Sequence, residues 1–120
     1  MLSSLEKLPI YPGCDDSSNE TAKECLSEKI KNFVNANFNT NAVKPYAQKG
    51  VNRVYVRFTI SKEGDIKEVE ARASAPQLAE EAERVIALLP DMTPGEKGGE
   101  AVNALYTLPI FFQIDEDTSN

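Results

Sequence analysis

The block from residue 51 to residue 114 constrains the fold more than any other feature of this 120-residue chain. Its apolar residues recur at every second position, then at every third and fourth position, and finally at every second position again. A period of two is typical of a half-buried strand, and a period near 3.6 is typical of an amphipathic helix. The block therefore predicts two strands, a helix and a last long strand, in that order.

The first two predicted strands form a hairpin. Residues 54–60 alternate apolar and polar side chains, as an antiparallel strand with one buried face requires. The polar segment 61–65 follows, and its Gly64 can take the positive φ of a tight turn. The second strand is expected over residues 66–73, with a bulge that displaces Lys67.

A helix is predicted after this hairpin. Ser74 and Gln77 have the spacing of a capping box, and Pro90 should end the helix. Glu80 and Arg84 are expected to pair on its exposed face. The apolar stripe consists of Leu78, Ala82, Val85, Ile86 and Leu89.

An earlier helix is predicted to start at Thr21 and to fade in the asparagine-rich segment 35–42, since asparagine favours caps and turns. Residues 1–20 before it are interpreted as an arm, because prolines and a glycine interrupt regular structure there. The apolar stripe of this helix consists of Ala22, Leu26, Ile30, Phe33 and Val34.

The last strand is expected to begin near Ala101 and to run to Ile114, with thirteen residues of unbroken period two. Pro109 lies in the middle of it. Because proline cannot donate a ladder hydrogen bond, this strand should lie at an edge of the sheet. An edge proline protects against aggregation, whereas the residues before it can still offer backbone groups to a guest strand. The two interpretations are compatible.

Composition and charge exclude several functions. The net charge of −6 and the absence of a basic cluster argue against nucleic acid and anionic membrane surfaces as partners. The chain contains no histidine, so Ser-His and Cys-His nucleophiles and histidine-containing zinc sites cannot form. Its acidic residues are spread over solvent-patterned positions. We therefore expect neither an enzyme nor a bound cofactor or metal.

The two cysteines, Cys14 and Cys25, are predicted to form a disulfide. Cys14 lies in a turn-forming context rather than on an apolar face, and the intervening residues are polar and acidic. Such a bond would pin the arm to the first helix and would indicate an oxidising compartment. Two free thiols in a reducing cytosol and a metal site that includes these cysteines are the alternatives.

Several ordered segments together carry a resemblance to a known family. They are VYVRFTI at 54–60, LAEEAERVIALLP at 78–90, TPGEK at 93–97 and LPIFFQI at 108–114. In this order they resemble the C-terminal domain of TonB-type energy transducers, over roughly residues 42–114. PIYPGC at 9–14, Cys25 and the segment FVNANF resemble the N-terminal extension of Bacteroidota members.

The resemblance implies an α+β fold in which two helices pack on one face of a three-stranded antiparallel sheet, in the order α-β-β-α-β. The domain would occupy residues 21–114, followed by an acidic tail at 115–120. Phe58, Leu78, Val85 and Tyr106 are expected to be buried in its core, since the strand alternation puts Phe58 and Tyr106 on one side of the sheet and the helix with Leu78 and Val85 packs on that side.

The resemblance also implies a function. Family members are periplasmic domains tethered to the inner membrane; they pair their last strand with the TonB box of outer-membrane receptors and use the energy of inner-membrane motor proteins for nutrient uptake. The free edge also allows a homodimer by strand pairing. Carried over residue by residue, the partner-binding strand comprises Val102, Asn103, Ala104, Leu105, Tyr106, Thr107 and Leu108.

Three departures from the family pattern stand out. Asn41 and Ala42 replace a Tyr-Pro pair, Asn52 replaces a glycine, and Met92 replaces a tryptophan. The first concerns a receptor-contacting motif, and the other two are interpreted as structural.

The alternative function is a peptide-binding sensor domain of a membrane-embedded signalling protein or peptidase, in which the same edge recognises a peptide without force.

Overall fold

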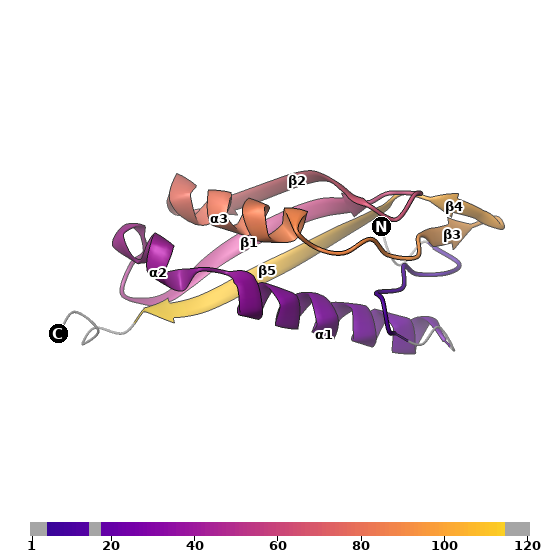
Figure 1. The fold of residues 1–120 in the computed structure, drawn as a ribbon, viewed down its shortest axis with the longest axis horizontal. Coiled ribbons are helices and arrows are strands. Elements are labelled where there is room, and N and C mark those ends of the chain that lie inside the picture. Colours follow the sequence, from indigo (N-terminus) through magenta and orange to yellow (C-terminus); the bar gives the residue numbers. More distant parts are fainter. Residues whose placement is uncertain (1–4, 15–17, 115–120) are drawn as a thin grey trace.

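A computed structural model describes residues 5–14 and 18–114 of the chain. The predicted acidic tail lies outside the described residues. The molecule is elongated, with extents of 56 × 24 × 20 Å (Figure 1). Its elements are α1 (Asn19–Asn37), α2 (Thr40–Val43), the 3-10 helix η2 (Lys44–Tyr46), β1 (Gly50–Ile60), β2 (Ile66–Ala73), α3 (Pro76–Ala87), β3 (Gly95–Lys97), β4 (Glu100–Val102) and β5 (Ala104–Ile114).

The main sheet has three antiparallel strands in the order β2-β1-β5, so β1 is central and β5 is an edge strand. This confirms the predicted α+β class and the three-stranded sheet. A second, two-stranded sheet of β3 and β4 and the short helix α2 were not predicted. The four residues expected in the core, Phe58, Leu78, Val85 and Tyr106, are all buried, which confirms the predicted inward faces of the strands and of α3.

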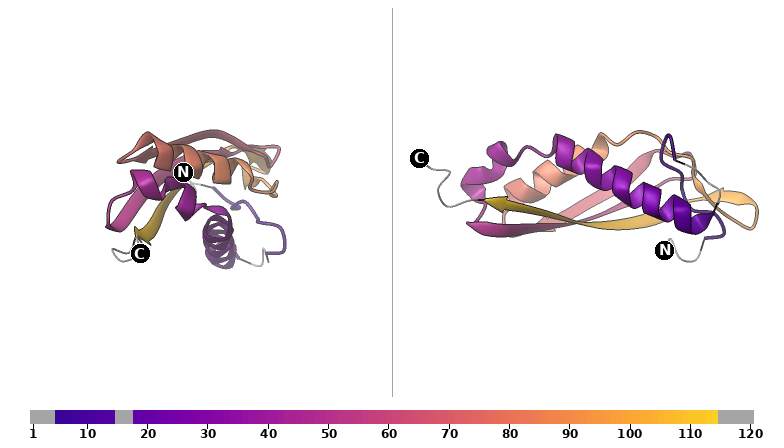
Figure 2. Two further views of the ribbon diagram at one scale, coloured as in Figure 1. Left: turned by 60° about the vertical axis from the view of Figure 1, so that its left-hand side comes forward. Right: turned by 90° about the horizontal axis from the view of Figure 1, so that it is seen from below.

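Two helices cover the sheet. Figures 1 and 2 show α3 over β1 and β2, and α1 running beside β5. The helix α1 begins at Asn19, two residues before the predicted start, because the Ser18 side chain accepts a hydrogen bond from the Thr21 amide and caps it. The core residues that the helices contribute are Leu26, Ile30, Val34, Leu78, Ala82, Val85 and Ile86.

The strand β2 contains a bulge one residue beyond the predicted position. Arg57 pairs with Glu70 and Thr59 pairs with Lys67, so β2 has one residue more than β1 between these pairs. Glu68 takes a φ of 55° there. A left-handed residue is a usual way to insert an extra residue into a strand, although glycine is the more common occupant.

Both polar contacts predicted for α3 are wrong. Ala75, and not Ser74, is the N-cap, and it makes no side-chain cap bond, because alanine has no polar side-chain atom. Pro76 follows at the first helical position, where proline is favoured. Arg84 pairs with Glu81, at 2.6 Å between Nη2 and Oε2, and not with Glu80. The same arginine donates to the Asn37 carbonyl oxygen at 3.0 Å, so it also links α3 to the end of α1.

The predicted single last strand is divided into two. Val102 ends β4 and pairs with Gly95 of β3, while β5 starts at Ala104. Asn103 lies between them, and its side-chain oxygen accepts the Lys62 amide at 2.8 Å. Because a side chain takes this amide, the ladder between β1 and β5 ends at the pair of Ile60 with Ala104.

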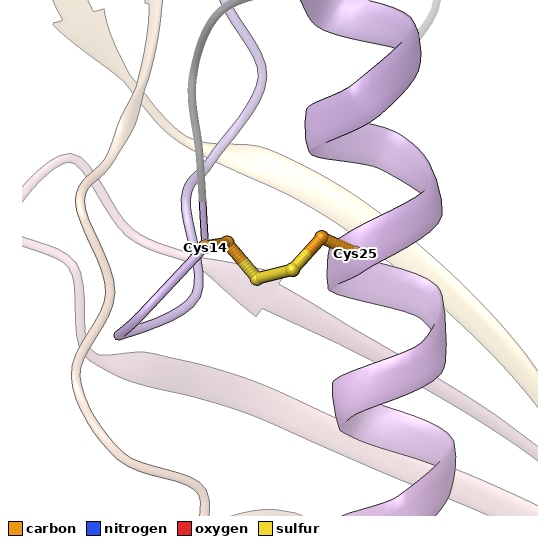
Figure 3. The surroundings of a disulfide bond; sticks show 2 residues. All are labelled: Cys14 and Cys25. Atoms are coloured by element: carbon orange, nitrogen blue, oxygen red, sulfur yellow. A yellow bond between two sulfur atoms is a disulfide. The ribbon is translucent and has the colours of Figure 1, made fainter.

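The arm lies against the small sheet. Its residues Lys7 and Ile10 form isolated bridges with Glu96 and Thr93. Cys14 at the end of the described arm is joined to Cys25 of α1 by a disulfide, with 6.0 Å between the Cα atoms (Figure 3). The predicted disulfide is therefore confirmed, and the arm is covalently attached to the second turn of α1.

Among the described residues, no helix combines the length and the apolarity that crossing a membrane requires.

Candidate functional site

The outer edge of β5 carries the candidate site, and the ladder decides which of its residues face outward. The Ser61 amide donates to the Asp65 carbonyl oxygen at 2.8 Å, on the β2 side of β1. Backbone groups of successive residues in a strand point to opposite sides, so the even-numbered residues of β1 direct theirs toward β5. Phe58 pairs with Tyr106. The odd-numbered residues of β5 therefore direct their backbone groups away from the sheet.

These outward-facing positions are Leu105, Thr107, Pro109, Phe111 and Gln113. Pro109 pairs with Tyr55 of β1, yet its missing N–H interrupts no bond of that ladder, because its nitrogen faces outward. The prediction that Pro109 marks an edge strand is confirmed by the strand order.

The structure brings five of the seven predicted partner-binding residues together on this strand. Ala104 and Tyr106 are buried on the helix side, Leu105 and Leu108 are half-buried, and Thr107 is exposed. Peptide contact by these residues remains a prediction.

The other two lie elsewhere. Val102 belongs to the hairpin of β3 and β4, and the side chain of Asn103 is engaged by the Lys62 amide. A guest strand on β5 would begin beside them.

A groove of about 480 Å³ runs between the edge of β5 and α1. The Tyr106 hydroxyl donates to Ser27 Oγ at 3.0 Å and connects the two sides. Sequence reasoning did not assign α1 to the site, although a polar stripe at a spacing of four was visible in it. The groove is lined by Ser27, Lys31, Val34 and Asn35 of α1 and by residues 106–111 of β5.

The face of the sheet opposite the helices is exposed and carries arginine and aromatic side chains. Tyr55 and Phe111 are each more than half exposed, and the Arg53 guanidinium carbon lies 5.9 Å from the centre of the Phe111 ring. Arg57 forms an ion pair with Glu70 across β1 and β2, and the hydrogen bond from Arg57 lowers the pKa of the Glu70 carboxyl. This pair is solvent-exposed and contributes little to stability.

What the site offers chemically is a row of backbone donors and acceptors beside a partly apolar groove. Such an edge can bind an extended polypeptide by adding it to the sheet. Its alternating side chains would then meet α1 on one side of the sheet and solvent on the other.

Comparison with known proteins identifies the domain. The family model described as Gram-negative bacterial TonB protein C-terminal matches residues 47–114, which include the main sheet and α3. The match covers more than half of the chain and begins after Asn41 and Ala42. A search of curated proteins found no match.

The family is a periplasmic, non-enzymatic interaction family of Gram-negative bacteria whose members act with outer-membrane receptors. The ordered segments, the strand order and the family match agree over the same residues. The chain therefore belongs to the TonB C-terminal domain family.

Proposed function

We propose that this domain is the receptor-binding part of a TonB-type energy transducer. The edge strand β5 takes the TonB box of an outer-membrane receptor as an additional strand, and the parent chain couples the energy of inner-membrane motor proteins to nutrient uptake. The observation that carries the proposal is the outward-facing backbone of residues 105–113, which has no partner strand within the described residues.

The proposed location is the periplasm, with the parent protein tethered to the inner membrane. The disulfide between Cys14 and Cys25 supports an oxidising compartment, since such bonds persist in the periplasm and are rare in the cytosol.

Strand addition suits a partner that must be both recognised and pulled. The backbone hydrogen bonds give affinity that depends little on the guest sequence, whereas side chains next to the edge select among guests. Because β5 is a long strand, a load along it would be shared by several hydrogen bonds at once.

The first prediction tests the backbone of this edge. Leu105→Pro removes an outward-facing N–H while leaving the ladder to β1 in place, and Leu105→Ala removes only the side chain. We expect Leu105→Pro to weaken binding of a receptor N-terminal peptide about tenfold, which corresponds to loss of roughly one hydrogen bond, and Leu105→Ala to have a smaller effect. Fluorescence titration measures both affinities, and thermal melts check that each variant is folded.

Amide chemical shifts locate the bound peptide. In labelled domain, the signals of residues 104–108 should move first as the peptide is added. Shifts concentrated elsewhere, with equal affinity of the two Leu105 variants, would show that β5 is not the receptor-binding edge.

A further inference from the structure

We propose that helix α1 is the second wall of the peptide-binding groove, and that Ser27, Lys31 and Asn35 select the guest strand. This inference rests on the proposed function, because it names the side-chain chemistry by which the same edge chooses its peptide. It concerns a helix that lies entirely outside the residues matched by the family model.

The two walls of the groove differ in chemistry. One is the free edge of β5 over residues 106–111, and the other is a stripe of α1. Ser27, Lys31 and Asn35 are spaced by four residues and therefore lie on one face of the helix. Val34, which is buried, lies between this stripe and the core.

The occupant follows from the unpaired backbone groups of β5. A row of alternating N–H and C=O groups is satisfied by an extended polypeptide. A strand added to this edge lies about 4.8 Å from β5 in the plane of the sheet, along the groove that α1 lines. Every second side chain of that strand then points toward the α1 stripe.

The lining predicts which side chains fit. Leu108 is half-buried at the groove, so it offers an apolar surface to the guest. Lys31 is the charged residue among those that line the groove. None of the ion pairs between described residues involves its ammonium group. The groove therefore favours a guest that places apolar side chains on Leu108 and a carboxylate near Lys31.

The helix is held firmly enough to act as a wall. At its start, the disulfide joins it to the arm, and at its end Arg84 of α3 donates to the Asn37 carbonyl oxygen. In between, Tyr106 bonds Ser27 at 3.0 Å. Side chains on a fixed helix can discriminate among guests, because the helix does not move aside to relieve a clash.

The test uses two matched pairs of variants on α1. Lys31→Glu and Asn35→Tyr change the groove, and Lys29→Glu and Asn32→Tyr make the same changes at exposed positions that do not line it. The probe is a short fluorescent peptide of alternating valine and threonine with one central aspartate, and a second version carries lysine there. Affinities and the amide shifts of β5 are measured for the whole domain.

We expect Asn35→Tyr to weaken binding of both peptides roughly tenfold or more by filling the groove, and Asn32→Tyr to leave it unchanged. Lys31→Glu should weaken the aspartate peptide roughly two- to fivefold relative to Lys29→Glu and strengthen the lysine peptide by a similar factor.

Two different failures can be told apart. If the two variants of each matched pair bind the peptides with equal affinity and the β5 amide shifts are retained, α1 has no role in selection. Strand addition at β5 is then left intact. Absence of β5 amide shifts with every peptide, including a receptor N-terminal peptide, overturns the proposed function and the α1 wall together.

Discussion

At the scale of single residues, Glu81 links α3 to the segment that follows α1. Its carboxylate accepts hydrogen bonds from the Arg84 side chain and from the Asn39 amide at 2.7 Å, and its side chain is only 10% exposed. The hydrogen bond from Arg84 is the main cause that lowers the pKa of Glu81. The ionised form of this carboxylate is therefore the one that the folded state favours.

The pH dependence of stability follows from that direction. A lowered folded pKa gives stability that is fully present above the unfolded value, about 4.3, and is lost as the pH falls through the folded value. We expect Glu81→Gln to reduce the free energy of unfolding by about 1 kcal/mol at neutral pH, and the difference from wild type to shrink in acid.

Urea denaturation at a series of pH values from about 7 down to about 2.5 measures how this difference changes. Glu80→Gln is the matched control, because Glu80 is exposed. A constant difference between Glu81→Gln and wild type across this range would show that the charge of Glu81 does not contribute.

Glu68 occupies a backbone conformation that its side chain disfavours. Its φ of 55° lies in the left-handed region, in which asparagine is more easily accommodated. We expect Glu68→Asn to raise the free energy of unfolding by about 0.5 kcal/mol. Glu68→Gln, which keeps the side-chain length, should leave it unchanged. If Glu68→Asn is instead destabilising, the hydrogen bond from Thr59 Oγ1 to Glu68 contributes more than the backbone term.

At the scale of elements, β5 combines a free edge with one missing donor. Pro109 faces outward in the centre of the strand, so two copies that pair along this edge lose hydrogen bonds there. We expect Pro109→Val to shift the protein toward dimers, because valine restores the N–H and favours strands.

Sedimentation velocity over a range of concentrations measures this association. Thr107→Val is the control, since it adds similar apolar surface at another outward-facing position without adding an N–H. If both variants associate equally, dimer formation depends on the valine side chain and not on the restored N–H of residue 109.

The sequence predicted the helices and strands that bury one face, because such burial makes apolar side chains recur at a regular spacing. Phe58 and Leu78 are buried because their elements pack with one face on the core, and this selects the alternating and helical patterns. The ends were less predictable, because Ala75 caps α3 through its backbone alone. The hairpin of β3 and β4 was missed, since strands of three residues are too short to show a period.

The edge of the site was predictable and its second wall was not. Pro109 indicated an edge within the strand pattern itself. The place of Lys31 beside β5 depends on how α1 packs across the sheet, and local sequence does not encode that arrangement directly. Asn52, which is interpreted as structural, makes local hydrogen bonds: it is 2% exposed, and its amide nitrogen donates to the carbonyl oxygens of Gln48 and Gly50.

At the scale of the whole molecule, the disulfide unites the arm with the helical layer. The bond closes a loop with a sequence separation of 11. A loop of that length is expected to contribute about 3 kcal/mol to stability on loop-entropy grounds. Replacing Cys14 and Cys25 together by serine should therefore lower the free energy of unfolding by about that amount.

Denaturation with and without a reducing agent tests the origin of the effect. Reduced wild type should match the double serine variant, and the variant itself should not respond to the reducing agent. A variant as stable as the oxidised wild type would show that the arm is held by its hydrogen bonds to the small sheet alone.

The disulfide also defines how the domain would transmit tension. Once the hydrogen bonds of the arm to Thr93 and Glu96 have broken, a pull applied through the arm reaches α1 across the two sulfur atoms, so the disulfide bypasses the segment between Cys14 and Cys25. Only after reduction could that segment extend, which would lengthen the tether by about 30 Å at roughly 3.3–3.6 Å per residue. Oxidation of one cysteine pair thus shortens and stiffens the route by which force would reach the sheet.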